Sequence, residues 1–314
     1  MPTVIVTGGA GFIGSHLAER FLREGWTVHI IDSLVTGKRE NLPAKATFHE
    51  LDIRDPKAAE LIASTKPDVL AHLAAQMDVR RSVEDPAYDA SVNILGSLNL
   101  LEAVRTKSPT TRVVFASTGG ALYGDNTTPP NFEEFKKDPE SPYAVSKLTV
   151  EHYFGYYGRV HGLDCVAMRF GNVYGPRQDP HGEAGVVAIF CGLLRSEDPL
   201  RVFGDGEQTR DYVYVGDVVA AILAAERVLA ADGAAVHGPY NVGTGIETSV
   251  LDLARRLGAV TGADPEIEHH PARKGEVQRV AIDPGAARDD LGWVAATGLD
   301  DGLAATAAAL GDDD

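Results

Sequence analysis

A tyrosine and a lysine four residues apart form a candidate acid–base pair in this chain. They stand in the segment Tyr143-Ala144-Val145-Ser146-Lys147, and side chains at positions i and i+4 share one face of a helix. A free tyrosine has a pKa of about 10 and is a poor base at neutral pH, but a nearby ammonium group favours the phenolate. The spacing therefore predicts proton transfer by Tyr143 with help from Lys147, although surface pairs often have the same spacing.

Three glycines have the spacing of a nucleotide phosphate site. Gly8, Gly11 and Gly14 give the pattern G-x-x-G-x-x-G between an apolar β-branched run and a helical pattern. Glycines here permit a tight turn and close approach to a pyrophosphate, and the following helix N-terminus offers free N–H groups. Asp32 ends the next apolar run, where an acid suits ribose hydroxyls and repels a 2′-phosphate. The sequence therefore predicts an NAD site. Because Tyr143 and Lys147 follow such a nucleotide-binding pattern in the chain, their spacing favours a catalytic pair over a surface pair.

The elements that must position these residues alternate between strands and helices. Short apolar runs predict strands at Val4–Val6, Val28–Asp32, Phe48–Asp52, Val69–Leu73, Arg112–Ser117 and Val166–Phe170. Helical patterns lie between them, at Pro56–Thr65, Tyr88–Thr106 and Tyr143–His161. This alternation predicts an α/β fold with a Rossmann-type, doubly wound parallel sheet.

The later part of the chain is less regular. Glycine and proline are dense in residues 171–185, and residues 265–284 mix charges with turn residues. We therefore expect residues 1–171 to form an NAD-binding domain, to which residues 212–245 return. Residues 172–314 are expected to form a smaller, irregular α/β C-terminal substrate domain.

Composition and charge exclude several classes of partner. The chain has 314 residues and a net charge of −16, so its overall field does not favour nucleic acid or an anionic membrane. Its two cysteines, Cys165 and Cys191, predict reduced thiols in a cytoplasmic protein. No apolar run approaches the ~18 residues of a membrane helix, and no signal peptide is evident at the N-terminus. The histidines His72, His181, His269 and His270 do not have the spacing of a metal site, so no metal is expected.

Together with further motifs, these features make the chain resemble an extended short-chain dehydrogenase/reductase, and more closely the UDP-glucose (UDP-galactose) 4-epimerase family. The similarity runs from Val4 to about Leu310. Its motifs are Leu73-Ala74-Ala75-Gln76, Ser117-Thr118-Gly119-Gly120-Ala121-Leu122-Tyr123-Gly124, Ser141-Pro142-Tyr143, Arg169-Phe170-Gly171-Asn172-Val173-Tyr174-Gly175-Pro176, Arg210-Asp211-Tyr212 and Tyr240-Asn241-Val242-Gly243-Thr244-Gly245. The combination is specific for the superfamily and less specific for the reaction.

The resemblance implies roles for individual residues. Tyr143 would exchange a proton with the sugar 4-hydroxyl, and Lys147 would bind the nicotinamide ribose. A side-chain hydroxyl at the end of the fifth predicted strand would hydrogen-bond the same sugar 4-hydroxyl. Thr118 is the expected residue, with Ser117 as the alternative. The residues expected at the cofactor are Gly8, Gly11, Phe12, Ile13, Gly14, Asp32, Ser33, Asp52, Ile53, Leu73, Ala74, Ala75, Gln76, Asn93, Ser117, Tyr143 and Lys147.

The resemblance also implies a UDP-sugar substrate. Arg210 and Arg273 would bind its diphosphate, which needs local bidentate donors in an acidic protein. Asn172 would contact the sugar or the diphosphate. Val187 and Phe203 would line the nucleotide site, with ordinary packing as an equal alternative. The small Val280 is typical of relatives that admit N-acetylated sugars.

The residues after Thr118 bear on the reaction. Gly119 and Gly120 stand where dTDP-glucose 4,6-dehydratases have an Asp-Glu pair and UDP-glucuronate decarboxylases have a nearby Glu. Without that second pair, the simplest chemistry takes a hydride from C4 and returns it to the opposite face. This predicts an isomerase of galactose metabolism, UDP-glucose 4-epimerase. The alternatives are a UDP-GlcNAc or UDP-glucuronate 4-epimerase, a dehydratase, a decarboxylase, or a non-catalytic NAD-binding sensor.

The resemblance finally implies a homodimer. In this family, the helices corresponding to residues 88–106 and 143–161 form a four-helix bundle with those of a second copy. Tyr153, Phe154, Tyr156 and Tyr157 are therefore candidate interface residues, with the core as the alternative.

Overall fold

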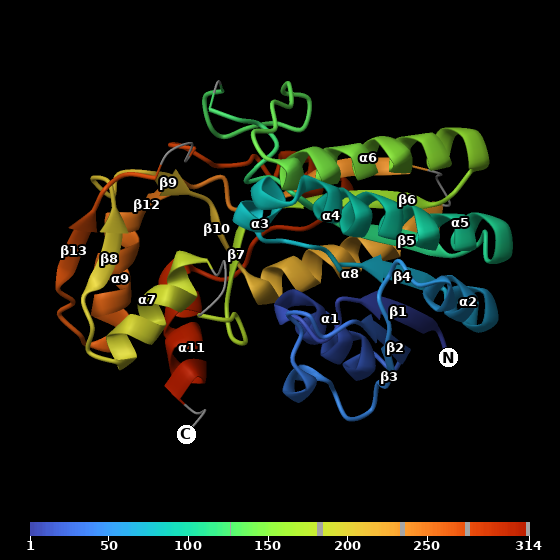
Figure 1. Cartoon of the computed structure of the whole chain (residues 1–314), viewed down its shortest axis with the longest axis horizontal. Helices are drawn as coiled ribbons and strands as arrows, with labels where there is room; N and C mark the ends of the chain where they lie inside the picture. The colour runs from blue at the N-terminus through green and yellow to red at the C-terminus, as the bar shows by residue number, and fades with distance from the viewer. Residues whose placement is uncertain (126, 181–184, 233–235, 274–276, 312–314) are drawn as a thin grey trace. The chain divides into compact units, whose positions relative to one another are not determined.

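The computed structural model (Figure 1) describes residues 1–125, 127–180, 185–232, 236–273 and 277–311. The chain divides into two compact units of three segments each. Unit 1 contains Met1–Thr118, Pro139–Arg169 and Val219–Tyr240, and unit 2 contains Gly119–Asp138, Phe170–Val218 and Asn241–Asp314. The expected boundary at residue 171 did not anticipate that residues 119–138 group with unit 2. The roles assigned to the two parts stay predictions.

A sheet of seven strands forms the centre of the fold. The strands are β1 (Thr3–Thr7), β2 (Thr27–Asp32), β3 (Thr47–Glu50), β4 (Val69–His72), β5 (Arg112–Thr118), β6 (Cys165–Phe170) and β11 (Val236–Val242). Their order is β11-β6-β5-β4-β1-β2-β3, and the pairs around β1 and β4 are parallel. The order reverses between β1 and β4, which is where such sheets bind ligands at the carboxyl ends of their strands. The predicted Rossmann-type sheet is confirmed.

The helices of unit 1 pack against this sheet. They include α1 (Phe12–Arg23), α2 (Pro56–Thr65), α3 (Val79–Glu84), α4 (Pro86–Ala90), α5 (Ser97–Lys107) and α6 (Pro142–His161). Residues of α2, α5 and α6 form a continuous apolar core with Ile5, Leu70 and Phe115 of the sheet. Helix α6 begins where the Ser141 side chain caps it and ends at Gly162, which has a φ of 67°.

The predicted helix over residues 88–106 is helical throughout, but it contains a π-helical turn that was not predicted. It consists of α4, a π-helical turn η2 (Ser91–Gly96) and α5. Asn93 is buried within the π turn. Such turns occur frequently at functional sites, and this one lies in the segment that carries a predicted cofactor residue.

Unit 2 is built from short strand pairs and helices. Strand β7 (Asn172–Tyr174) pairs with β10 (Tyr212–Tyr214), β8 (Leu200–Phe203) with β13 (Ile267–His270), and β9 (Thr209–Arg210) with β12 (Thr248–Ser249). The helices α7 (Val186–Arg195), α9 (Val250–Thr261), α10 (Gly285–Leu291) and α11 (Leu299–Gly311) accompany them, while α8 (Val215–Asp232) begins in this unit and continues into unit 1. Residues of α7, α9 and α11 share one apolar core with β8. The predicted smaller, irregular α/β part is confirmed.

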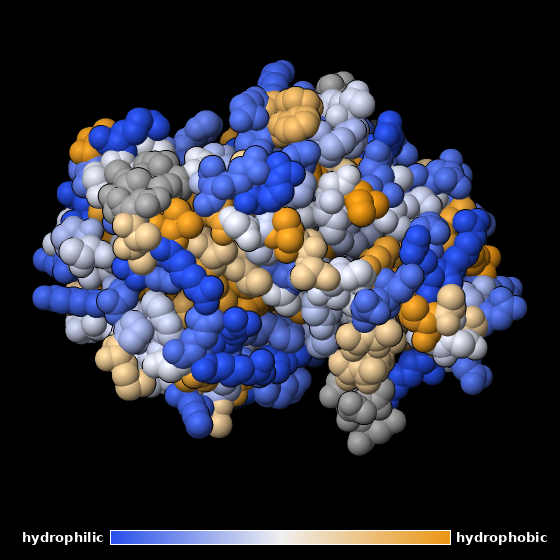
Figure 2. Space-filling model, turned by 180° about the vertical axis from the view of Figure 1, so that it is seen from behind, coloured by the Kyte–Doolittle hydropathy of each residue, from blue (hydrophilic) through white to orange (hydrophobic). Residues whose placement is uncertain are grey.

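The surface is mixed in character. Figure 2 shows hydrophobic side chains scattered among hydrophilic ones over the rear face. Among the described residues, no helix has the length and apolar character needed to cross a membrane.

Candidate active site

The glycine loop after β1 is packed so closely against backbone atoms that Gly8 and Gly14 could not carry side chains. Gly8 has a φ of +72°, and a Cβ on it would lie 2.8 Å from the Ala74 backbone nitrogen. A Cβ on Gly14 would lie 2.1 Å from the Gly8 carbonyl oxygen. Gly11 begins α1 without a side-chain cap, and the first turn has no acidic residue. The N–H groups of Phe12, Ile13 and Gly14 therefore suit the pyrophosphate of a dinucleotide.

Asp32 lies at the carboxyl end of β2 and is 8% exposed. Its carboxylate accepts hydrogen bonds from the backbone N–H groups of Ala10 (3.0 Å) and Leu34 (2.8 Å). Burial raises its pKa, and the two backbone hydrogen bonds oppose that shift. Each oxygen keeps a further lone pair that can accept from a ribose hydroxyl. Ser33 follows it and is exposed.

Asp52 and Ile53 lie in the turn beyond β3, which ends at Glu50 and not at the predicted Asp52. Arg54 binds both Asp52 oxygens, at 2.7 Å and 3.0 Å, and its hydrogen bonds lower the Asp52 pKa. Ile53 is buried, and its carbonyl accepts from Asn99. If Asp52 also accepts from the adenine amine, its carboxylate would bind Arg54 and the adenine at once. That adenine contact stays a prediction.

The segment after β4 brings the other predicted cofactor residues together. Backbone N–H groups of Leu73 and Ala74 donate to the Thr7 hydroxyl at 3.2 Å and 3.1 Å, and Ala75 follows half-buried. The Gln76 N–H donates to the Asn93 side-chain oxygen at 2.8 Å, and the Asn93 amide donates back to the Gln76 carbonyl at 2.9 Å. The π turn is thus fixed against the carboxyl ends of β1 and β4.

Tyr143 and Lys147 lie on α6 beside β5. The Lys147 ammonium is buried, donates to the Ala116 carbonyl at 2.8 Å and lies 5.8 Å from the centre of the Tyr143 ring. Burial lowers the Lys147 pKa to about 8, while the charges of Asp89 and Glu151 oppose that shift. Burial and the Asp89 charge both raise the pKa of Tyr143. A Tyr143 phenolate therefore needs nearby positive charge.

The structure distinguishes the two candidate hydroxyls of β5. Ser117 is buried and donates to Glu151, whose carboxylate also accepts from Arg169 at 2.6 Å and 3.0 Å. Thr118 is the last residue of β5 and is half-buried. Its hydroxyl has no partner within the described part of the chain. Thr118 therefore keeps its hydrogen-bonding capacity, and its contact with a substrate stays a prediction.

Sequence reasoning missed three residues of this region: Asp89, Ser146 and Glu151. Asp89 lies four residues before Asn93, and Glu151 lies four residues after Lys147, so helical spacing was a signal for both. Their partners come from other elements of the sheet and helix layer, which a pattern within one segment does not reveal.

The predicted substrate residues lie in unit 2. The Arg273 guanidinium stacks on the Phe203 ring at 3.9 Å from its centre. Arg210 donates to the Thr209 carbonyl at 2.8 Å, and the same carbonyl accepts from the Val280 N–H at 3.2 Å.

Two further residues of this set have different surroundings. A Cβ on Gly120 would lie 3.4 Å from the Asn172 side-chain oxygen, so these residues are neighbours. Val187 is fully buried in the core of unit 2, as expected for the alternative in which it has an ordinary packing role.

Asp211, next to Arg210, is a fully buried carboxylate with four hydrogen bonds. It accepts from the hydroxyl and N–H of Thr244 and from the N–H groups of Gly245 and Ile282, at 2.6–3.1 Å. These bonds fix the strand that carries Arg210 to two other segments of unit 2.

The histidines considered for metal binding have other surroundings. His72 is buried between the hydroxyls of Thr7 and Ser97, and burial lowers its pKa to about 3. His269 contacts the Gly204 carbonyl, and His181 lies outside the described residues. Within the described ranges, no three His, Cys, Asp or Glu side chains are grouped as metal ligands.

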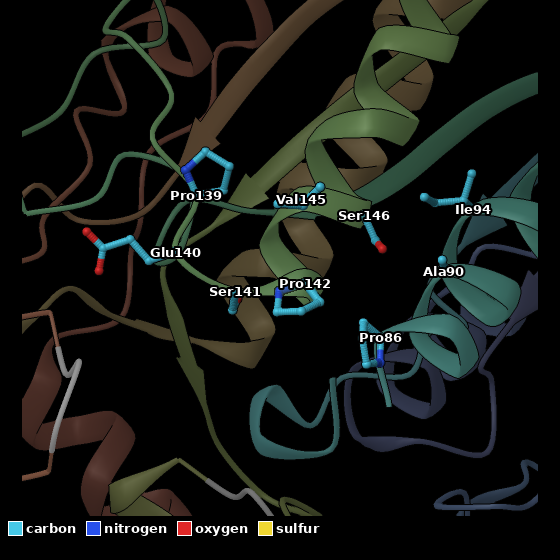
Figure 3. Close-up of a pocket in the computed structure, with 9 residues that line it drawn as sticks. All are labelled: Pro86, Ala90, Ile94, Pro139, Glu140, Ser141, Pro142, Val145 and Ser146. Atoms are coloured by element: carbon cyan, nitrogen blue, oxygen red, sulfur yellow. The ribbon is translucent and has the colours of Figure 1, made fainter. Parts of the chain in front are cut away.

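A separate pocket of about 480 Å³ lies in unit 1 between α4, η2 and the start of α6 (Figure 3). It is lined by Pro86, Ala90, Ile94, Pro139, Glu140, Ser141, Pro142, Val145 and Ser146. Neither Tyr143 nor Lys147 lines it, so it is distinct from the candidate acid–base pair.

Comparisons with known proteins agree with this geometry. Residues 4–243 match the family model described as the NAD dependent epimerase/dehydratase family. The chain is 44% identical over 308 residues to UDP-glucose 4-epimerase of Mycolicibacterium smegmatis, covering 96% of each. It is similar to the crystal structure of UDP-glucose 4-epimerase with UDP-glucose from Thermotoga maritima, with a TM-score of 0.92, 43% identity and 98% coverage of each chain. It is also similar to the Thermus thermophilus UDP-glucose 4-epimerase complex with NAD, with a TM-score of 0.90, 41% identity and coverage of 99% and 100%.

Proposed function

The chain belongs to the NAD dependent epimerase/dehydratase family, and from that premise we propose that it inverts C4 of a UDP-hexose. The reaction interconverts UDP-glucose and UDP-galactose through a transient 4-keto sugar. The observation that carries this proposal is the Tyr143–Lys147 pair on α6 beside the end of β5, followed there by Gly119 and Gly120. The UDP-glucose 4-epimerases to which the chain is similar support it.

The residues of unit 1 fit NAD. The tight glycine loop leads into the uncapped N-terminus of α1, whose N–H groups suit a pyrophosphate, and Asp32 offers acceptors for ribose hydroxyls. NAD, when bound, supplies the acceptor and donor of hydride for sugar C4. Lys147 would bind the nicotinamide ribose, while Gln76 and Asn93 fix the adjoining loop.

Tyr143 holds and moves the proton of the sugar 4-hydroxyl. It accepts this proton as C4 is oxidised and returns it as C4 is reduced. Because burial and Asp89 raise the Tyr143 pKa, the phenolate depends on the cationic Lys147 and on the positive charge of oxidised nicotinamide. Thr118 would donate or accept at the same hydroxyl and hold it toward Tyr143.

Arg210 and Arg273 of unit 2 would hold the UDP diphosphate. Guanidinium groups bind phosphates through two parallel N–H bonds, and the net charge of −16 makes such local cations necessary. Phe203, which lies under Arg273, would keep that side chain extended toward the nucleotide. A phosphate clamp also lets the keto sugar rotate while the nucleotide stays bound.

The alternatives require groups that these positions do not supply. A dehydratase or decarboxylase needs an acid–base residue after Thr118, where this chain has two glycines. A non-catalytic sensor would not need the paired Tyr143 and Lys147. The small Val280 supports some activity on UDP-N-acetylglucosamine, and a UDP-glucuronate epimerase would need a further cation at C6.

Tyr143→Phe tests the proposal. We expect UDP-glucose turnover to fall by about 10²–10⁴-fold, because the variant cannot exchange the 4-hydroxyl proton. NAD should stay bound, as measured by cofactor release on denaturation. A variant with wild-type turnover would contradict the mechanism. A panel of UDP- and dTDP-sugars with the wild-type protein would identify the preferred substrate.

We also expect a homodimer through α6 and η2. Apolar side chains are exposed there: Leu95, Val145, Tyr156 and Val160 are each 43–61% exposed. Two copies would bury these residues in a four-helix bundle. Val160→Asp should shift the protein toward monomers in sedimentation equilibrium, whereas a monomeric wild type would exclude the bundle.

A cytoplasmic location is part of the same proposal. Cys165 and Cys191 are both buried and neither takes part in a disulfide, as expected of reduced thiols. Fractionation of the source cells would test it, and recovery outside the cytoplasm would contradict it.

A further inference from the structure

A buried carboxylate lies between the cofactor loop and the helix that carries the acid–base pair. Asp89, on α4, is completely inaccessible to solvent. One oxygen accepts from the side-chain amides of Gln76 (3.1 Å) and Asn93 (2.9 Å), and the other accepts from the Ser146 hydroxyl at 2.6 Å. The carboxylate therefore connects three separate segments of unit 1.

The directions of these hydrogen bonds follow from the network. The Asn93 oxygen accepts from the Gln76 N–H, so its nitrogen must face Asp89. The Gln76 oxygen accepts from the Asp78 N–H, so its nitrogen also faces Asp89. Asp89 thus receives donors only, which is the arrangement of an ionised carboxylate.

The charge of Asp89 has no cation in contact with it. Its hydrogen-bond partners among the described residues are neutral, and a buried anion is costly unless positive charge lies near. Ser146 lies between Tyr143 and Lys147 in the sequence, so Asp89 connects to the turn of α6 that carries both. The buried Lys147 ammonium is the positive group of that turn.

We propose that Asp89 is a positioning residue for the reaction. Its carboxylate holds the acid–base turn of α6 through Ser146 and the cofactor loop through Gln76 and Asn93 in one arrangement. It also supplies the fixed negative charge that balances the buried Lys147 ammonium. This inference rests on the proposed function for the identity of the substrate.

Several charged groups act on the same pair. The Asp89 charge raises the pKa of both Tyr143 and Lys147. Glu151, one turn further along α6, also raises the Lys147 pKa, but it is ion-paired with Arg169 of β6. His72 of β4 has a pKa of about 3 and is neutral at working pH. Among these charged side chains that affect Tyr143 and Lys147, Asp89 is therefore the anion that has no cation in contact with it.

Asp89→Asn removes the charge and can keep the contacts. The Asn oxygen can accept from Gln76 and Asn93, and its amide can donate to the Ser146 oxygen. Asp85→Asn is the matched control, because Asp85 caps the same helix but is exposed, and Asn also caps helices well. Ser146→Ala cuts the connection to α6 and leaves the charge in place.

The experiment is a titration of the Tyr143 phenol in the NAD complex. Tyrosinate absorbance is measured against pH, and subtraction of the Tyr143→Phe titration in each background isolates this residue. We expect its pKa to fall by about one pH unit in Asp89→Asn and to stay unchanged in Asp85→Asn and Ser146→Ala. An unchanged Tyr143 pKa in Asp89→Asn would overturn the electrostatic part of the proposal.

Turnover tests the positioning part. Ser146→Ala should lower kcat for UDP-glucose several-fold with little change in KM, and wild-type kinetics would overturn it.

If Asp89→Asn does not fold, Asp89→Glu serves in its place. It should keep the raised Tyr143 pKa and lower kcat, and wild-type kcat would overturn the positioning role. The titration needs bound NAD but no sugar turnover, so it can succeed where the substrate assignment fails.

Discussion

At the scale of single residues, the account depends on the buried Lys147. Because burial lowers its pKa to about 8, the ammonium loses its proton as pH rises through that value. We therefore expect turnover to fall above about pH 8, since the neutral amine no longer stabilises the Tyr143 phenolate. A pH–rate profile measures this fall in turnover at alkaline pH. The Lys147→Arg variant stays cationic and should show no such fall. A wild-type profile that is flat to pH 10 would contradict the electrostatic role of Lys147.

Residue patterns confined to one segment were predictable from the sequence. The Gly8–Gly14 loop and the Tyr143–Lys147 pair each lie within a single turn or loop, so their spacing alone reveals them. Asp89 and Ser146 are 57 residues apart and meet only in the folded chain. The choice between Ser117 and Thr118 likewise needed the partner Glu151, which comes from another element.

At the scale of elements, a buried ion pair joins α6 to the sheet. The side chains of Glu151 and Arg169 are 7% and 3% exposed, and the Ser117 hydroxyl donates a further hydrogen bond to Glu151. Glu151→Gln would leave the buried guanidinium facing a neutral amide, so we expect a loss of about 3 kcal/mol in the free energy of unfolding. Urea denaturation measures it. Asp289→Asn, at an exposed pair with Arg288, is the control and should leave stability unchanged.

Element types were more predictable than element ends. The alternation of apolar runs and helical patterns predicted the sheet because buried parallel strands are short and uniformly apolar. The ends of β3 and β5 differed from the predicted ones, because ladder hydrogen bonds and not side-chain pattern determine where a strand stops. The π turn η2 was not predicted, since its side chains have the spacing of an ordinary helix over a few residues.

At the scale of the whole molecule, the sequence predicted a nucleotide fold followed by an irregular remainder. The chain passes between its two units several times, and residues 119–138 group with unit 2. A linear reading places this segment with the strand that precedes it. Gly119 and Gly120 therefore matter in two ways. They replace the acid–base pair of the alternative reactions, and they begin the segment at which the chain passes from unit 1 to unit 2.

The most direct test of the proposed reaction is the fate of the C4 hydrogen. Purified protein is given UDP-glucose deuterated at C4, with no added reductant, and the products are analysed by NMR and mass spectrometry. Because the hydride leaves C4 and returns to C4, we predict UDP-galactose that keeps deuterium at C4. Loss of the label to solvent, its transfer to C6, or the absence of any C4-inverted product would contradict the account.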